Sequence, residues 1–148
     1  MAGHDISAGG LITTLLEMCF SNMEGGMEIS LNKIKEDDII KILFAENPGI
    51  VIQVKDKHKE EVKKILEDAG IGYVKLGKPT EERHILVEKG DATYQFGIDY
   101  LRDVWYSTSY LLDCKAEHER LCQKNVSRTT RNNLWNFVFD KSFTGKTF

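Results

Sequence analysis

The sequence contains no long apolar run. None of its hydrophobic stretches approaches the roughly 20 residues that a membrane-spanning helix requires, and no secretory signal pattern precedes the first motif. Positive charge is also scarce, because 23 acidic residues outnumber 20 basic ones and leave a net charge of −3. A chain of this charge has no general electrostatic attraction to nucleic acid. We therefore expect neither a membrane nor a nucleic-acid partner.

Cysteine is sparse as well. The three cysteines, Cys19, Cys114 and Cys122, are an odd number and do not follow the spacing of a metal site. This usage is typical of a reducing compartment, so it predicts a cytoplasmic location. Spacing supports no Ser–His–Asp or Cys–His arrangement either. We predict no catalytic residue within this chain.

The residues that are present suffice for a folded domain. Of the 148 residues, 41% are hydrophobic and 29% are charged, which is typical of one globular domain with its own core. Residue periodicity and turn signals predict the following elements. Helices are predicted over 8–21, from Glu36 or Asp37 to 44, over 56–70 and over 98–114, with a short charged helix over 116–124. Strands are predicted over 27–31, 50–54 and 71–76, with a chain break at 78–80 and a hairpin of 85–87 with 94–96.

This order of elements predicts an α/β (α+β) fold, a two-layer sandwich whose mixed sheet is covered by helices mainly on one face. The β-branched run over 50–54 is expected to be a central strand buried on both faces. The helix over 8–21 is apolar over most of its circumference, so we expect part of it to stay uncovered and to promote self-association. Cys19 and Trp105 are expected in the core.

The densest motif lies at residues 3–11, where a polar cluster runs through two glycines into the first helix. Ser7 can cap that helix through its hydroxyl. The free N–H groups at such a helix start, with the positive end of the helix dipole, favour an anion. Gly9 and Gly10 lack a Cβ and would let a bulky ligand approach the backbone.

Asp5 stands beside this predicted anion site, and a carboxylate repels phosphate. A divalent cation between the two groups removes the conflict, since magnesium binds one or two carboxylates together with phosphate oxygens. The motif therefore predicts a nucleotide phosphate, a magnesium ion on Asp5 and a hydrogen bond from Ser7. The alternative interpretation is that Asp5 and Ser7 merely cap a helix.

Three blocks of the chain resemble one enzyme family. Residues 4–11 read His-Asp-x-Ser-x-Gly-Gly-Leu, residues 44–54 read Phe-x-Glu-x-x-Gly-x-x-x-Gln-Val, and residues 101–110 read Leu-x-x-x-Trp-x-x-Thr-Ser-Tyr. Together they resemble the phosphoribosylformylglycinamidine synthase family in its long single-chain form. The similar segment is the C-terminal domain of the second synthetase half, which is related to aminoimidazole ribonucleotide synthetase.

The resemblance implies roles for individual residues. The aspartate of the first block coordinates magnesium at an auxiliary nucleotide site and the serine contacts that nucleotide, so Asp5 is the implied metal ligand and Ser7 the implied cofactor-binding residue. Ala8 stands where many relatives carry aspartate, and His4 receives no role. The implied cofactors are ATP or ADP and Mg²⁺, both expected to be absent from an isolated fragment. Thr108 and Ser109 could border the site of the intact enzyme.

The resemblance also implies an activity for a larger protein. That activity is the ATP- and glutamine-dependent conversion of formylglycinamide ribonucleotide to formylglycinamidine ribonucleotide, in which ATP activates the amide oxygen and ammonia displaces phosphate. The implied partners are the N-terminal synthetase domains and a glutamine amidotransferase domain. Residues 1–125 would form the domain and residues 126–148 an extended connector toward the amidotransferase. We expect the chain to be an excised piece, inactive by itself.

A different class of function stays open. The predicted strand–helix–strand over 50–76 is also typical of ferredoxin-like regulatory domains, so the chain could be a non-catalytic interaction or small-ligand module. The motif with Asp5, Ser7, Gly9 and Gly10 separates the two interpretations, since a regulatory module does not need it.

Overall fold

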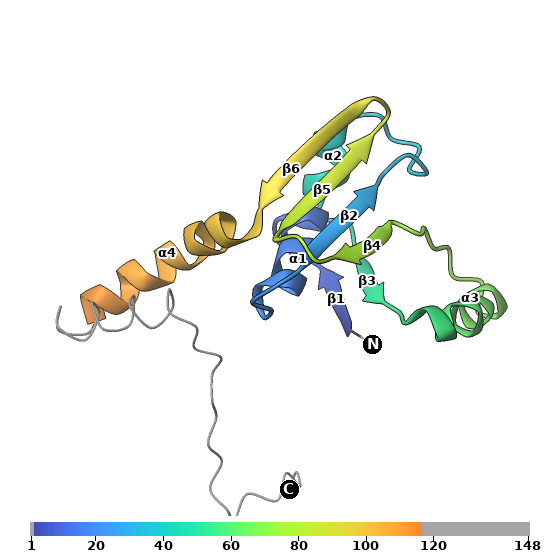
Figure 1. Cartoon of the computed structure of the whole chain (residues 1–148), viewed down its shortest axis with the longest axis horizontal. Helices are drawn as coiled ribbons and strands as arrows, with labels where there is room; N and C mark the ends of the chain where they lie inside the picture. The colour runs from blue at the N-terminus through green and yellow to red at the C-terminus, as the bar shows by residue number, and fades with distance from the viewer. Residues whose placement is uncertain (1, 117–148) are drawn as a thin grey trace, which may run out of the picture. The chain divides into compact units, whose positions relative to one another are not determined.

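The computed structural model describes residues 2–116 (Figure 1). The chain divides into two units, Met1–Trp105 and Tyr106–Phe148. The strands are β1 (Ala2–Ile6), β2 (Gly26–Ser30), β3 (Gly49–Gln53), β4 (Gly77–Thr80), β5 (His84–Lys89) and β6 (Ala92–Gly97). The helices are α1 (Gly10–Phe20), α2 (Ile39–Phe44), the 3₁₀ turn η1 (Asp56–His58), α3 (Lys59–Asp68) and α4 (Ile98–Ala116). The predicted helix over 116–124, apart from its first residue, and the predicted connector over 126–148 lie outside the described residues.

Four strands form a mixed sheet in the order β4-β2-β5-β6 (Figure 1). The central strands β2 and β5 are parallel, and the two outer pairings are antiparallel. β5 and β6 form the expected hairpin, whose turn places Gly90 at φ +58°. The α+β class, the two-layer arrangement and the mixed sheet predicted from the sequence are thus confirmed.

One strand lies later in the chain than predicted. Residues 71–76 form no helix or strand, and the strand begins at Gly77 and includes Pro79, where a chain break was expected. Proline is tolerated there because, within residues 2–116, β4 is an edge strand that pairs with β2 alone. β3 and β4 belong to different sheets, so α3 does not join two parallel strands as the ferredoxin-like alternative requires.

The prediction of a central strand buried on both faces is wrong for β3. β3 pairs only with β1, in a separate antiparallel two-stranded ribbon. Val51 packs against the core, while Ile50 and Ile52, which point to the opposite face, are 74% and 43% exposed. A β-branched run therefore indicated a strand correctly but did not show how many neighbours the strand has.

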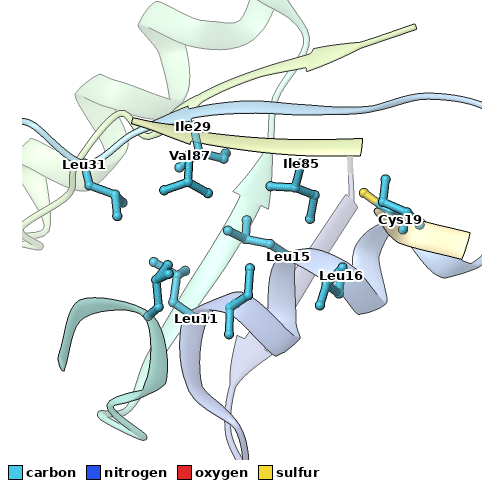
Figure 2. Packing of buried hydrophobic residues seen from close by; sticks show 11 residues of the cluster. Leu11, Leu15, Leu16, Cys19, Ile29, Leu31, Ile85 and Val87 are labelled. Atoms are coloured by element: carbon cyan, nitrogen blue, oxygen red, sulfur yellow. The ribbon is translucent and has the colours of Figure 1, made fainter. Parts of the chain in front are cut away.

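The core lies between α1 and the four-stranded sheet (Figure 2). Leu15 of α1 is 1% exposed and points toward Ile85 and Val87 of β5, which are fully buried. α1 also contacts β1 and α2, so it is covered on several sides. The remaining buried apolar side chains are Leu11, Ile12, Leu16, Cys19, Ile29, Leu31, Leu43 and Ile98.

The apolar side chains of α1 that were expected to promote self-association are covered. Leu11, Ile12, Leu15 and Leu16 are all buried within the domain, none of them more than 8% exposed. The helix is apolar nearly all round because its neighbours lie nearly all round it, including the β1–β3 ribbon that the sequence pattern did not predict. The expected uncovered face of α1 is therefore wrong.

Two helix starts differ from expectation. The N-cap of α2 is Asp38, whose carboxylate accepts hydrogen bonds from the amides of Ile40 and Lys41, whereas Glu36 or Asp37 was expected. Asp56 opens the short turn η1 instead of capping α3, which buries none of its residues and lies to the side of both sheets in Figure 1. α3 ends at Asp68, and Gly70, the predicted end of the helix, follows its C-cap Ala69 at φ +66°.

Arg83 joins three elements at one end of the domain. Its guanidinium donates to the carbonyl oxygens of Cys19 at 3.0 Å and Gly25 at 3.2 Å, and its Nε lies 3.0 Å from a carboxylate oxygen of Asp99. These contacts fix the first turn of α4 next to the end of α1. Trp105, expected in the core, is 48% exposed and contacts the ring of Phe20 at a centroid distance of 5.9 Å.

Candidate functional site

The site motif begins on a strand. No strand was predicted over residues 2–6, but they form β1, in which Asp5 lies opposite Ile50 of β3. Side chains alternate along an extended backbone, so His4 and Ile6 are half-buried and Asp5 between them is exposed. The strand was missed because a five-residue segment with glycine, histidine and aspartate carries little strand signal.

The backbone of Asp5 is held while its carboxylate stays accessible. Its carbonyl oxygen accepts a hydrogen bond from the hydroxyl of Thr14 at 3.0 Å and lies 2.8 Å from Nδ1 of His4. Its side chain is 73% exposed, and one of its carboxylate oxygens lies 3.6 Å from Nδ1 of His4. The arrangement presents one carboxylate to solvent from a fixed position.

His4 links this strand to α1. Its Nε2 lies 3.0 Å from a carboxylate oxygen of Glu17, while Nδ1 faces the backbone of Asp5. Both partners are acceptors, and a neutral imidazole has one N–H, so it can donate to only one of them at a time. The structure thus places His4 between the site strand and the first helix.

Ser7 does not cap α1. The N-cap position belongs to Gly9, in the left-handed conformation at φ 84°, and it has no side-chain cap hydrogen bond. Ser7 contributes its carbonyl oxygen instead, which accepts from the amide of Gly10 at 3.0 Å and closes a turn. The side chain of Ser7 is exposed, so its hydroxyl is not used for capping. The alternative interpretation of Ser7 as a helix cap is wrong.

The start of α1 is not an open anion site. The amide of Gly9 donates to Oε1 of Glu46 at 2.9 Å, so a carboxylate of this domain already lies at the positive end of the helix. A Cβ on Gly10 would lie 2.7 Å from the carbonyl oxygen of Leu43. Both glycines adopt positive φ angles, Gly10 packs closely on α2, and a Cβ on Gly9 would clash with the side chain of Thr13. The approach of a ligand to this backbone stays a prediction.

Asp5 is the metal ligand predicted from the sequence. Among residues 2–116, no group of three or more His, Cys, Asp or Glu side chains is arranged to hold a metal. Magnesium takes only one or two protein carboxylates and completes its shell with phosphate oxygens and water. The single exposed carboxylate of Asp5 fits that requirement as one ligand of an ion shared with other groups.

Cys19 is the one cysteine whose side chain the structure describes, and it is not a nucleophile. It is 4% exposed, and burial raises the pKa of its thiol, an effect that the nearby Arg83 guanidinium partly opposes. A buried thiol of raised pKa is mostly protonated and unreactive at neutral pH. Its place in the core is as predicted. The side chains of Thr108 and Ser109 lie outside those described.

One protein family matches more than half of the chain. The family described as AIR synthase related protein, C-terminal domain, matches residues 1–89, which include β1, the turn at 7–10, α1 and Glu46. The chain belongs to this family.

Among residues 2–116, no helix is long and apolar enough to cross a bilayer.

Three relatives illustrate the similarity. Phosphoribosylformylglycinamidine synthase of Homo sapiens is 35% identical over 130 residues, which cover 80% of this chain and 10% of that protein. The subunit PurL of this synthase in Aquifex aeolicus (strain VF5) is 36% identical over 104 residues, 69% of this chain and 14% of the subunit. The probable membrane antigen 75 of Saimiriine herpesvirus 2 (strain 11) is 28% identical over 141 residues, 95% of this chain and 10% of the antigen. The chain thus spans about a tenth of the length of these relatives.

For two residues at the site, the sequence predicted no role. Thr14 lies in the helix that was expected to be apolar over most of its circumference, but it is 2% exposed and its hydroxyl donates to the carbonyl oxygen of Asp5. Glu46 was part of a matched block but carried no role. A threonine within an otherwise apolar helix was a usable signal for Thr14, since a buried hydroxyl needs a partner. No local pattern announces a contact such as that of Glu46, which spans 37 positions.

Proposed function

We propose that this chain is the C-terminal domain of the second synthetase half of a phosphoribosylformylglycinamidine synthase. The whole enzyme would convert formylglycinamide ribonucleotide to formylglycinamidine ribonucleotide with ATP and glutamine-derived ammonia. ATP transfers a phosphoryl group to the amide oxygen, and ammonia then displaces phosphate. One observation carries the proposal: relatives of that name in Homo sapiens and Aquifex aeolicus are 35% and 36% identical to the chain.

Within that enzyme, the chain would contribute to an auxiliary nucleotide–magnesium site. Asp5 would be a magnesium ligand and Ser7 would contact the nucleotide. Support comes from the Asp5 carboxylate, which is exposed while its backbone is held by Thr14. It comes also from the exposed side chain of Ser7, which makes no cap hydrogen bond to α1. The metal would supply positive charge between this carboxylate and the nucleotide phosphates, which would otherwise repel each other. Its other ligands would come from the rest of the enzyme.

The proposed partners are the N-terminal synthetase domains and a glutamine amidotransferase domain. The net charge of −3 supports the absence of a nucleic-acid partner. We place the reaction in the cytoplasm, which the odd number of cysteines and the unpaired Cys19 support. The catalytic residues would lie outside this chain.

The test uses the polypeptide encoded by the whole reading frame around this sequence and, in parallel, the 148-residue chain alone. Both are incubated with formylglycinamide ribonucleotide, ATP, magnesium and glutamine, and the amidine product is measured by mass spectrometry. We expect turnover by the whole polypeptide and none by the chain, because a site assembled from several domains loses orientation and electrostatics when divided. Turnover by the chain alone, or none by the whole polypeptide, contradicts the proposal.

A further inference from the structure

Glu46 reaches the site motif from a distant part of the sequence. It follows α2, and its Oε1 accepts the amide hydrogen of Gly9 at 2.9 Å across 37 positions. Gly9 precedes the first residue of α1, so the bond joins the segment between α2 and β3 to the turn that follows Asp5. The comparisons and the motif assign no function to this carboxylate.

The turn is held on both sides of Gly9. Glu46 accepts from the amide of Gly9, and the carbonyl oxygen of Gly9 accepts from the hydroxyl of Thr13 at 3.1 Å. The amide of Gly10 donates to the carbonyl oxygen of Ser7 at 3.0 Å. With Gly9 and Gly10 at φ +84° and +72°, a conformation that an unrestrained chain visits only part of the time, these bonds define the path from Ser7 into α1.

The Glu46 carboxylate also lies at the start of α1. A carboxylate at the start of a helix occupies the place where the dipole would otherwise attract a phosphate. Together with Asp5 it makes the motif negative. A nucleotide can approach such a surface when a cation neutralises its phosphates, which is the chemistry proposed for Asp5.

We propose that Glu46 is a positioning residue for the auxiliary nucleotide–magnesium site. Its carboxylate fixes the turn at 7–10 by accepting the Gly9 amide, and the fixed turn holds the Ser7 hydroxyl in place relative to the Asp5 carboxylate. This inference rests on the proposed function of Asp5 and Ser7. Glu46 acts through the backbone and does not touch the nucleotide.

The first experiment measures the turn itself in this chain, with no ligand. Amide hydrogen exchange is followed by NMR in the wild type and in Glu46→Ala, Glu46→Gln and Glu24→Ala. Glu24 is the matched control, an exposed glutamate in the turn that follows α1. Loss of one hydrogen bond should raise the exchange rate of the Gly9 amide about tenfold in Glu46→Ala. Glu46→Gln retains an acceptor oxygen and should stay near the wild-type rate, as should Glu24→Ala.

The second experiment measures affinity for Mg²⁺–ADP in the whole enzyme stripped of nucleotide, by calorimetry. Glu46→Ala should weaken binding about tenfold, with Glu46→Gln restoring affinity to within about threefold of wild type. The melting temperature should hardly change, because the Glu46 bond is exposed. A residue that acted only through overall stability would shift the melting temperature together with affinity.

The outcomes separate this inference from the proposed function. If Asp5→Ala loses Mg²⁺–ADP and Glu46→Ala binds it like the wild type, the positioning role is wrong while the site stands. If Glu46→Gln is as weak as Glu46→Ala, the negative charge matters and not the acceptor oxygen, which also contradicts the positioning role. If Asp5→Ala binds like the wild type, the proposed site itself is wrong.

Discussion

The buried hydroxyl of Thr14 donates to the backbone carbonyl oxygen of Asp5 at 3.0 Å. The same hydroxyl lies 3.2 Å from the carbonyl oxygen of Gly10, one turn earlier in α1. Thr14 therefore connects the strand that carries the exposed carboxylate to the helix packed most deeply in the core. Its side chain is 2% exposed, so this link between the site and the core is itself buried.

Replacing Thr14 with valine should destabilise the domain. Thr14→Val keeps the shape of the side chain and removes its hydroxyl, which weakens the pairing of the Asp5 carbonyl oxygen. We expect the free energy of unfolding to fall by about 1–3 kcal/mol, measured by urea titration. Thr93→Val, at an exposed position of β6, should change it by less than about 0.5 kcal/mol. Equal stability of Thr14→Val and wild type would show that the bond to Asp5 contributes nothing.

The contrast between α1 and β3 gives a second prediction. Leu15→Ala should lower the free energy of unfolding by about 2–5 kcal/mol, because it opens a cavity in the core. Ile50→Ala should cost less than about 1 kcal/mol, since its side chain is 74% exposed. Urea titrations of both variants check this. A cost for Ile50→Ala equal to that for Leu15→Ala would mean that β3 is covered on both faces after all.

The cap of α2 can be assigned by mutation. Asp38 accepts the amides of Ile40 at 2.9 Å and Lys41 at 3.4 Å, so Asp38→Ala should cost about 0.5–2 kcal/mol. Asp37→Ala removes the adjacent carboxylate, which makes no cap bond to α2, and should cost less. Thermal unfolding of the two variants decides between them. A larger loss for Asp37→Ala would restore the start of the helix expected from the sequence.

The thiol of Cys19 predicts a pH dependence of stability. Burial raises its pKa in the folded chain above the ordinary value of 9.0. The unfolded chain then ionises at a lower pH than the folded one, so the contribution to stability is fully present below about pH 9 and is lost as pH rises through the folded pKa. The loss of stability between about pH 8 and pH 10.5 should be smaller in Cys19→Ala.

Unfolding titrations at several pH values in this range check the prediction. Other groups ionise in both chains, so the difference between wild type and Cys19→Ala isolates Cys19. Parallel pH profiles for the two chains would contradict the raised pKa.

Much of the fold could be predicted from local patterns. Alternation identified β2 and the β5–β6 hairpin, and helical periodicity identified α1 and α4. These signals work because side-chain direction repeats every 2 residues in a strand and about every 3.6 in a helix. The position of Cys19 in the core follows from the same periodicity.

Neighbour relationships were beyond those patterns. The run over 50–54 identified a strand, but the number of strands beside it depends on the whole chain, so its burial was predicted wrongly. Residues 78–80, with Pro79, were predicted as a chain break because an edge position, where a strand tolerates proline, cannot be recognised locally. These errors share one cause, since each depends on contacts between segments far apart in sequence.

The candidate site was likewise predicted only in part. Asp5 and Ser7 were found from a motif, and both are exposed, two positions apart in the chain. The start of α1 was predicted as an open anion site because the sequence could not reveal that Glu46 accepts the Gly9 amide. Whether Asp5 holds magnesium stays a prediction.

The most direct test of that prediction counts magnesium and nucleotide bound to the purified whole enzyme. Wild type, Asp5→Asn and the control Asp37→Asn are compared after gel filtration, with metal measured by plasma mass spectrometry and nucleotide by chromatography. Asp5→Asn keeps the size of the side chain and removes its charge. We predict that Asp5→Asn loses the magnesium and the nucleotide of the auxiliary site, while Asp37→Asn keeps them. A full complement of magnesium and nucleotide on Asp5→Asn would contradict the metal role of Asp5.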